Sequence, residues 1–123
     1  KIGENVHYLG IKENIGDYLA CSDAFVLSSD FEGLPISLLE AISMGVVPIC
    51  TPVGGIKEVI ESNKIGFLST ELTSHALRDQ VLNFLKCSDA EVSQLKQRCE
   101  EVFINQYTID ITSEKYLNVY EEK

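Results

Sequence analysis

Hydrophobic residues in the first half of the chain gather into short runs that polar and glycine-rich segments separate. The runs A-F-V-L-S at 24–28 and V-V-P-I-C at 46–50 are nearly continuous, which is typical of strands buried on both faces of a parallel sheet. Shorter patterns at 6–9 and 66–68 predict two further strands. Pro48 lacks the N–H that a strand donates to its neighbour, so we expect weakened pairing near that position.

Between and after these strands, hydrophobic residues recur every three or four positions, as in helices that pack against a core. Asn14 suits an N-cap, Pro35 suits a first helical turn, and Gly45 suits the residue that ends a helix. Strands that alternate with helices predict an α/β fold in which a Rossmann-like parallel sheet is flanked by helices. The helices expected from the pattern span 14–21, 35–44, 56–62, 73–86, 89–107 and 111–122.

The order of these elements also predicts where a ligand would bind. In an open parallel sheet, ligands bind beyond the carboxyl ends of the strands. The loop 29–34 follows the strand at 24–28, and the glycine-rich turn 51–55 follows the strand at 46–50. We therefore expect both segments at the binding edge of the sheet.

The segment from Asp30 to Glu40 reads D-F-E-G-L-P-I-S-L-L-E and has the most specific layout in the chain. Its two carboxylates, Glu32 and Glu40, are separated by seven residues and stand on either side of a Gly-Leu-Pro corner. Gly33 has no side chain, so a ligand can approach the backbone there. The first N–H groups of the following helix, at 36–38, have no partner within the helix and form an anion site with the helix dipole. This layout suits a diphosphate.

The two acids differ in position and therefore in expected task. Glu40 lies about 150° around the helix from the apolar stripe, so it points away from the sheet. A carboxylate there can accept hydrogen bonds from vicinal hydroxyls such as those of a ribose. Glu32 precedes the corner and could accept from sugar hydroxyls or stabilise a developing oxocarbenium ion.

Each of these features also has a purely structural interpretation. A glutamate in a loop or on a helix flank is usually just solvated. The pair Gly54 and Gly55 fits a tight turn with a closely packed helix start, and Glu58 fits an acid that the helix dipole favours in the first turn.

Charge and composition argue against several classes of function. Ten basic and nineteen acidic residues give a formal charge of −9, which argues against nonspecific nucleic-acid binding and against docking on an anionic membrane. No apolar run approaches the ~20 residues that span a bilayer. With 123 residues, 45% of them hydrophobic, the chain is one domain or part of one. An anionic ligand must therefore be held by local features.

The cysteines and histidines form no recognisable site. The four cysteines, at 21, 50, 87 and 99, lie at no metal-ligand spacing and sit in apolar or helical segments. They predict buried or half-buried free thiols in a reducing compartment. His7 and His75 are isolated, which favours structural or surface roles.

With its two acids, its glycine–proline corner and its later G-G-x-x-E turn, the segment from Ser28 to Ile60 resembles the donor-binding signature of retaining glycosyltransferases of family 4, which have the GT-B fold. The upstream N-V-H-Y-L-G also fits, and the resemblance is good from about Asn5 to Leu68. It implies that 1–123 is a partial C-terminal donor-binding domain with 73–123 as its C-terminal helices.

The resemblance implies a role for each matching residue. Glu32 would contact the donor sugar and matter for catalysis, and Glu40 would bind the ribose. The backbone that approaches the sugar and diphosphate would be that of Gly33, Leu34, Pro35, Ile36 and Ser37, and the base would meet the backbone of Gly10 and Ile11.

The implied activity is that of a hexosyltransferase of polysaccharide biosynthesis. It would transfer a glycosyl group from a UDP- or GDP-sugar to a glycan or lipid acceptor with retention of the anomeric configuration. The resemblance implies no bound metal ion, no other cofactor and no nucleic-acid partner. It implies a cytoplasmic enzyme, with membrane association through an N-terminal domain as an open alternative.

The chain departs from the family pattern at its start. The family's donor domain begins two strands earlier, with a basic pair for the diphosphate, and an acceptor-binding N-terminal domain precedes it. In the strand order 3-2-1-4-5-6, this chain would hold strands 3 to 6. We expect the strand at 6–9 to be displaced, to pair with another chain so that copies self-associate, or to leave an exposed edge. The isolated chain would have little or no transferase activity.

Two other classes of protein remain as alternatives. The first is a non-catalytic nucleotide- or sugar-binding module that kept the pocket. The second is a doubly wound interaction domain of the response-regulator kind, which predicts acids at several strand ends. Here the acids gather around one helix instead.

Overall fold

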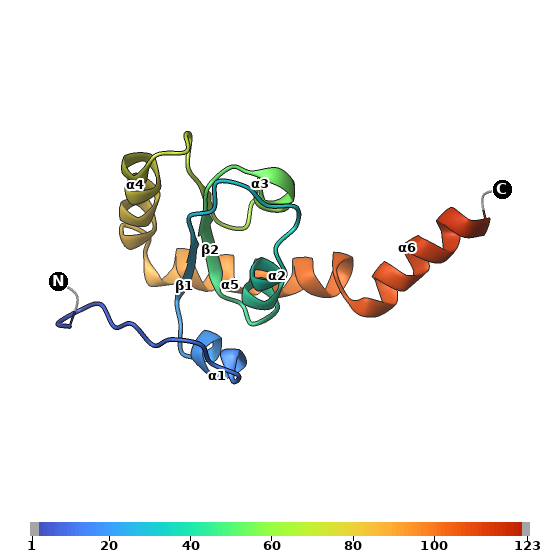
Figure 1. Ribbon diagram of the computed structural model, residues 1–123, viewed down its shortest axis with the longest axis horizontal. Helices are drawn as coiled ribbons and strands as arrows, with labels where there is room; N and C mark the ends of the chain where they lie inside the picture. Colours follow the sequence, from blue (N-terminus) through green and yellow to red (C-terminus); the bar gives the residue numbers. More distant parts are fainter. Residues whose placement is uncertain (1–2, 122–123) are drawn as a thin grey trace.

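The fold is a parallel α/β sheet with helices on both faces (Figure 1). The computed structural model describes residues 3–121. In this part of the chain the sheet has three strands in the order β1-β2-β3, namely β1 (Ala24–Leu27), β2 (Val47–Cys50) and β3 (Phe67–Leu68). Both pairings are parallel, which confirms the Rossmann-like fold class.

The central strand β2 accommodates Pro48 without losing a hydrogen bond. Val47 and Thr51 donate their N–H groups to the chain of β1 and its flank, so alternate residues of β2 face β1. Pro48 falls in the other phase and faces β3, which pairs with β2 only from Ile49 onward. The register with β1 stays intact at Pro48, whereas the pairing with β3 begins only at Ile49, which agrees with the weaker pairing expected near the proline.

The helices form two layers around this sheet. Helices α2 and α3 cover one face, α4 covers the other, and α5 runs along the amino end of the strands and packs against both layers (Figure 1). None of the helices between residues 3 and 121 is long and apolar enough to cross a membrane. Their bounds are α1 (Ile15–Ala20), α2 (Ile36–Ser43), α3 (Gly54–Asn63), α4 (Ser74–Leu85), α5 (Asp89–Gln106) and α6 (Ile109–Glu121).

The two faces of the sheet carry separate hydrophobic clusters. On the face of α2 and α3, the largest cluster joins Leu38 and Ile56 to Cys99 and Val102 of α5. On the opposite face, Phe84 of α4 packs with β2, and its ring meets that of Phe67 edge to face at 6.0 Å between centroids. The apolar stripe of α2 is therefore inside, as its period predicts.

The helix ends show which local signals were interpreted correctly. Gly45 has φ 67° and ends α2, because its N–H and that of Val46 bond back to the last turn. Pro35 is the N-cap of α2 and not its first helical residue, one position away from the expectation. Helix α3 begins at Gly54, two residues before the expected start, because the glycine pair belongs to its first turn.

The expected strand at 6–9 does not form in the described residues. Only Val6 makes an isolated bridge, and the chain from 7 to 13 is irregular and exposed. The N-terminal segment lies beside α1, at the amino end of β1 (Figure 1). In the described residues the outer edge of β1 is unpaired, and the segment does not join it. Among the expected outcomes, the segment is displaced from the sheet, and its pairing with another chain stays a prediction.

The strand β1 is also less buried than its sequence suggests. Val26 is 51% exposed, although the apolar run predicted burial on both faces. Helix α4 packs over β2 and β3 and leaves this side of β1 open. The face of β1 towards α2 is covered as expected, since Phe25 and Leu27 pack on the largest cluster.

The four cysteines are free thiols that differ widely in exposure. Cys50 and Cys99 are buried and Cys87 is half-buried, but Cys21 is exposed, which corrects the expectation for that residue. Burial raises the pKa of the Cys50 thiol, and likewise that of Cys99, to about 12. Both are therefore uncharged near neutral pH.

We expect an aromatic disulfide reagent at about pH 8 to modify Cys21 and Cys87 and to spare Cys50 and Cys99, since the thiolate is the reacting form. Mass spectrometry of proteolytic fragments would measure the labelling. In concentrated guanidinium all four thiols should react. Rapid labelling of Cys50 in the folded chain would contradict the buried core described above.

Candidate functional site

The loop that follows β1 places a partly buried carboxylate at the carboxyl edge of the sheet. The Glu32 Oε1 atom accepts a hydrogen bond from Ser29 Oγ at 2.7 Å. Ser29 is held in turn, because its carbonyl oxygen accepts from Thr51 Oγ1 at 2.5 Å. Thr51 is 4% exposed and follows β2 directly. The two segments predicted at the binding edge therefore meet there.

The glycine pair at the start of α3 packs directly against this loop. Gly54 has φ 51°, and a Cβ atom on it would lie 1.9 Å from the carbonyl oxygen of Glu32. The N–H of Gly55 donates to the carbonyl oxygen of Gly33 at 2.7 Å. The interpretation as a closely packed helix start is thus confirmed, and its packing partner is the acidic loop itself.

The start of α2 offers two free backbone donors. Leu38 N–H bonds to the Pro35 carbonyl oxygen at 3.1 Å, so it is not available to a ligand. The N–H groups of Ile36 and Ser37 donate to no acceptor within residues 3–121. The predicted anion site therefore has two free N–H groups at the end of the helix dipole, where three were expected.

Glu40 lies on the outer side of α2, as its angular position predicts. It is exposed, whereas its neighbours Leu38, Ala41 and Ile42 are fully buried. Its carboxylate makes no hydrogen bond or ion pair with the described part of the chain. Both of its oxygens are therefore open to a ligand.

Gly10 and Ile11 do not join these residues. Ile11 is fully exposed, and the segment that carries both runs beside α1, at the opposite end of the strands from the Glu32 loop (Figure 1). Their expected contact with a base stays a prediction. Gly33, Leu34 and Pro35, by contrast, lie in the loop itself.

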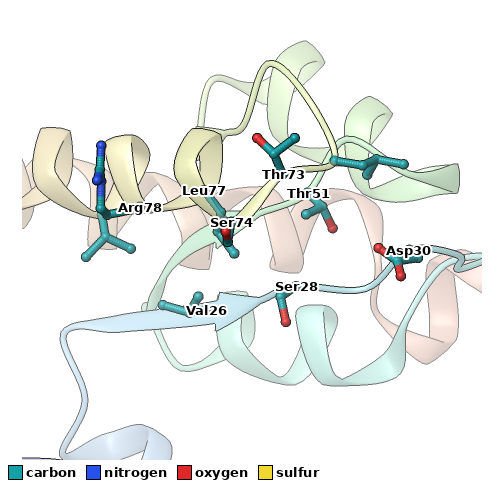
Figure 2. Close-up of a pocket in the computed structure, with 10 residues that line it drawn as sticks. Val26, Ser28, Asp30, Thr51, Thr73, Ser74, Leu77 and Arg78 are labelled. Atoms are coloured by element: carbon teal, nitrogen blue, oxygen red, sulfur yellow. The ribbon is translucent and has the colours of Figure 1, made fainter. Parts of the chain in front are cut away.

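Two cavities flank the loop. One of about 490 Å³ opens between the carboxyl ends of the strands and α4, and Figure 2 shows Ser28, Asp30 and Thr51 on its sheet side, opposite Thr73 and Ser74. The second, also about 490 Å³, lies between the loop, α3 and the junction of α5 with α6. Its lining residues are Gly33, Leu34, Gly54, Gly55, Glu58, Val59, Tyr107 and Lys115.

The second cavity contains residues that the sequence did not single out. Burial raises the pKa of Tyr107, and the Glu58 carboxylate nearby raises it further. Glu58 lines the same cavity as Tyr107 and is not an acid of the first turn, since α3 begins at Gly54. No sequence signal connects Tyr107 or Lys115 to the loop, because both come from helices that follow the sheet.

The hydroxyls of Ser29 and Thr51 were also missed, although a signal for them existed. Thr51 follows β2 directly and Ser29 lies two residues after β1, both in the segments that the carboxyl-end rule had already selected. In the described part of the chain, no group of three or more His, Cys, Asp or Glu side chains could hold a metal ion.

The structure therefore brings a restrained carboxylate, that of Glu32, to the carboxyl edge of the sheet beside the free N–H groups at the start of α2. The sequence was also compared with known families. Residues 1–102 match the family described as glycosyl transferases group 1. The chain belongs to this family.

Several curated relatives carry names of enzymes that transfer sugars. N-acetyl-alpha-D-glucosaminyl L-malate synthase of Bacillus anthracis is 36% identical over 121 residues, which are 98% of this chain and 30% of that protein. N,N'-diacetylbacillosaminyl-diphospho-undecaprenol alpha-1,3-N-acetylgalactosaminyltransferase of Campylobacter jejuni is 28% identical over 116 residues, which are 94% of this chain and 30% of that protein. The O-antigen biosynthesis glycosyltransferase WbnH of Escherichia coli is 43% identical over 68 residues, which are 55% of this chain and 20% of that protein. The chain thus spans less than a third of the length of these relatives.

Proposed function

We propose that this chain forms part of the donor-binding domain of a retaining glycosyltransferase of the GT-B type, family 4. The enzyme takes a hexosyl group from a UDP- or GDP-sugar and transfers it to a glycan or lipid acceptor. Two findings support the proposal: the membership in the group 1 family, and the loop that holds Glu32 and Gly33 against the glycine pair of α3.

The arrangement of the loop and helix α2 carries the proposal. The diphosphate would meet the free N–H groups of Ile36 and Ser37, which supply local positive potential in a chain of net charge −9. The Glu40 oxygens would accept from the two ribose hydroxyls. Glu32 would face the transferred sugar, with Gly33 leaving open space for it, since no atom lies within 4 Å of a Cβ placed there.

In this reaction the bond from the anomeric carbon to the diphosphate oxygen breaks, and a bond from that carbon to the acceptor oxygen forms. The diphosphate leaves with the electron pair of the broken bond, and the acceptor hydroxyl passes its proton to the departing diphosphate oxygen or to solvent. Positive charge develops on the sugar ring meanwhile, as in other reactions with oxocarbenium-like transition states. A carboxylate at Glu32 stabilises that charge, and the N–H groups of α2 stabilise the leaving diphosphate.

The wider setting of the proposal comes from the relatives. Several of them are named for O-antigen, colanic acid or amylovoran biosynthesis, which supports a role in polysaccharide biosynthesis. We further propose a cytoplasmic enzyme, with membrane association through an N-terminal domain as the alternative. The unpaired edge of β1 and the exposed segment 6–9 support self-association, because backbone groups along an open edge can pair with another strand.

Screening the intact transferase against a panel of UDP- and GDP-sugars tests the proposal, with NMR of the product to establish its anomeric configuration. Replacing Glu40 by alanine should raise the KM for the donor by about 10- to 100-fold and change kcat much less, because the ribose contact is present in the ground state as well. Glu61→Ala, at another exposed glutamate, on α3, is the matched control.

Three outcomes would count against parts of the proposal. If the intact protein consumes no nucleotide sugar, the proposed transferase activity is wrong. If Glu40→Ala leaves the KM for the donor unchanged, the proposed contact of Glu40 with the ribose is wrong. A product with inverted anomeric configuration would contradict the proposed retaining mechanism. Tight calorimetric binding of UDP or GDP by the 123-residue chain without turnover in the intact protein would favour the non-catalytic binding module.

A further inference from the structure

A relay of hydrogen bonds connects the end of β2 to the Glu32 carboxylate. Thr51 N–H donates to the Leu27 carbonyl oxygen at 3.1 Å and continues the pairing of the two strands. Thr51 Oγ1 donates to the Ser29 carbonyl oxygen at 2.5 Å. Ser29 Oγ donates to Glu32 Oε1 at 2.7 Å. Each link starts from a residue that the previous link holds, so the sheet itself restrains the carboxylate.

The backbone of Glu32 is restrained at the same time. Its carbonyl oxygen lies against Gly54, and the next carbonyl, that of Gly33, accepts from Gly55 N–H. A glutamate side chain has three rotatable bonds, and ordering it costs conformational entropy. The Ser29 hydroxyl bonds one carboxylate oxygen and leaves the second one for a ligand. The loop therefore presents one oxygen in a defined direction.

We infer that Ser29 and Thr51 are positioning residues for the carboxylate of Glu32. Ser29 orients the carboxylate directly, and Thr51 holds Ser29 through its backbone. This inference rests on the proposed role of Glu32 at the donor sugar. Neither hydroxyl touches the sugar in this scheme, because Ser29 Oγ bonds the carboxylate and Thr51 is buried.

The test uses the intact transferase with Ser29→Ala, Thr51→Val and their conservative partners Ser29→Thr and Thr51→Ser. Ser29→Ala should lower kcat by about 10- to 100-fold, the scale expected when a reacting group is displaced by about 1 Å, with little change in the donor KM. Thr51→Val should act in the same direction. Ser29→Thr and Thr51→Ser keep the hydroxyl and should recover most of the turnover.

A double-mutant cycle separates positioning from a merely structural effect. If Ser29 acts only through the carboxylate, Ser29→Ala should cost nothing further in a Glu32→Gln background. Ser22→Ala is the matched control, because the Ser22 hydroxyl also makes a 2.7 Å hydrogen bond, to the Tyr18 carbonyl oxygen on α1 far from the loop. Thermal melting of each variant reports any loss of fold.

The outcomes distinguish this inference from the proposed function. If Glu32→Gln itself keeps full turnover, the role of Glu32 fails and the inference falls with it. If Glu32→Gln is impaired but Ser29→Ala and Thr51→Val keep full turnover, the positioning role alone is overturned. The positioning role would also be overturned if Ser29→Ala lowered turnover by the same factor in the wild-type and Glu32→Gln backgrounds, because Ser29 would then act independently of the Glu32 carboxylate.

Discussion

Replacing Glu32 by alanine in the intact transferase is expected to lower kcat by about 10²- to 10⁴-fold, the range typical for removing a group that stabilises developing charge. Glu32→Gln should lose nearly as much. Glutamine keeps the size of the side chain and can still accept from the Ser29 hydroxyl, so the charge is the only large difference.

Initial rates at saturating donor and acceptor measure this loss, and thermal melting controls for folding. Glu32 is half-buried in a loop and makes no contact within the main cluster, so neither substitution should shift the melting temperature by more than a few degrees. Unchanged turnover in both variants would remove Glu32 from the chemistry. If Glu32→Gln keeps full turnover and Glu32→Ala loses it, the shape of the side chain is required and its charge is not.

Replacing Gly54 by alanine is expected to have the largest effect on stability, more than about 3 kcal/mol of unfolding free energy. The new Cβ would lie 1.9 Å from the Glu32 carbonyl oxygen and 2.7 Å from that of Gly33, and neither backbone atom can rotate away. The positive φ of 51° adds strain of its own. If Glu32 has the proposed role, turnover should fall as well, because relieving the clash moves the loop that carries it.

Calorimetric or circular-dichroism melts of the chain would measure this effect, with two glycine controls. Gly16→Ala places a Cβ in open space on α1 and should leave the melting temperature unchanged or slightly raised. Gly33→Ala also meets nothing within 4 Å and should keep the stability, yet lower transferase activity by obstructing the donor. A Gly54→Ala protein as stable as the Gly16→Ala protein would contradict the packing of the loop on α3.

The fold was predictable where a single local signal decides it. The continuous apolar runs located β1 and β2, and the period of α2 identified its buried face. The prediction of a strand at 6–9 was wrong, because a strand forms only where it pairs with a neighbouring strand, and an apolar pattern cannot show whether such a partner is present. The predicted burial of Val26 was wrong for a similar reason, since the exposure of its side chain depends on how far α4 reaches across the sheet.

The site was predictable only in outline. The rule about carboxyl ends brought the acidic loop and the glycine turn to one edge. It could not reveal that Gly54 touches Glu32, because that contact depends on distances between segments 22 residues apart in the chain, as does the bond from Thr51 to Ser29. Tyr107 and Lys115 come from still farther along the chain, where the sequence shows only ordinary amphipathic helices.

The path of α5 has a consequence for how the molecule opens. Cys99 and Val102 of this helix belong to the cluster on one face of the sheet, and Val92 and Leu95 pack against the cluster on the other. Detaching α5 would expose both clusters to water at once, so the two layers form a single cooperative unit in local unfolding. Helix α6 has no buried residue and falls outside that unit. Rapid amide exchange in α6 is therefore compatible with full protection of β2.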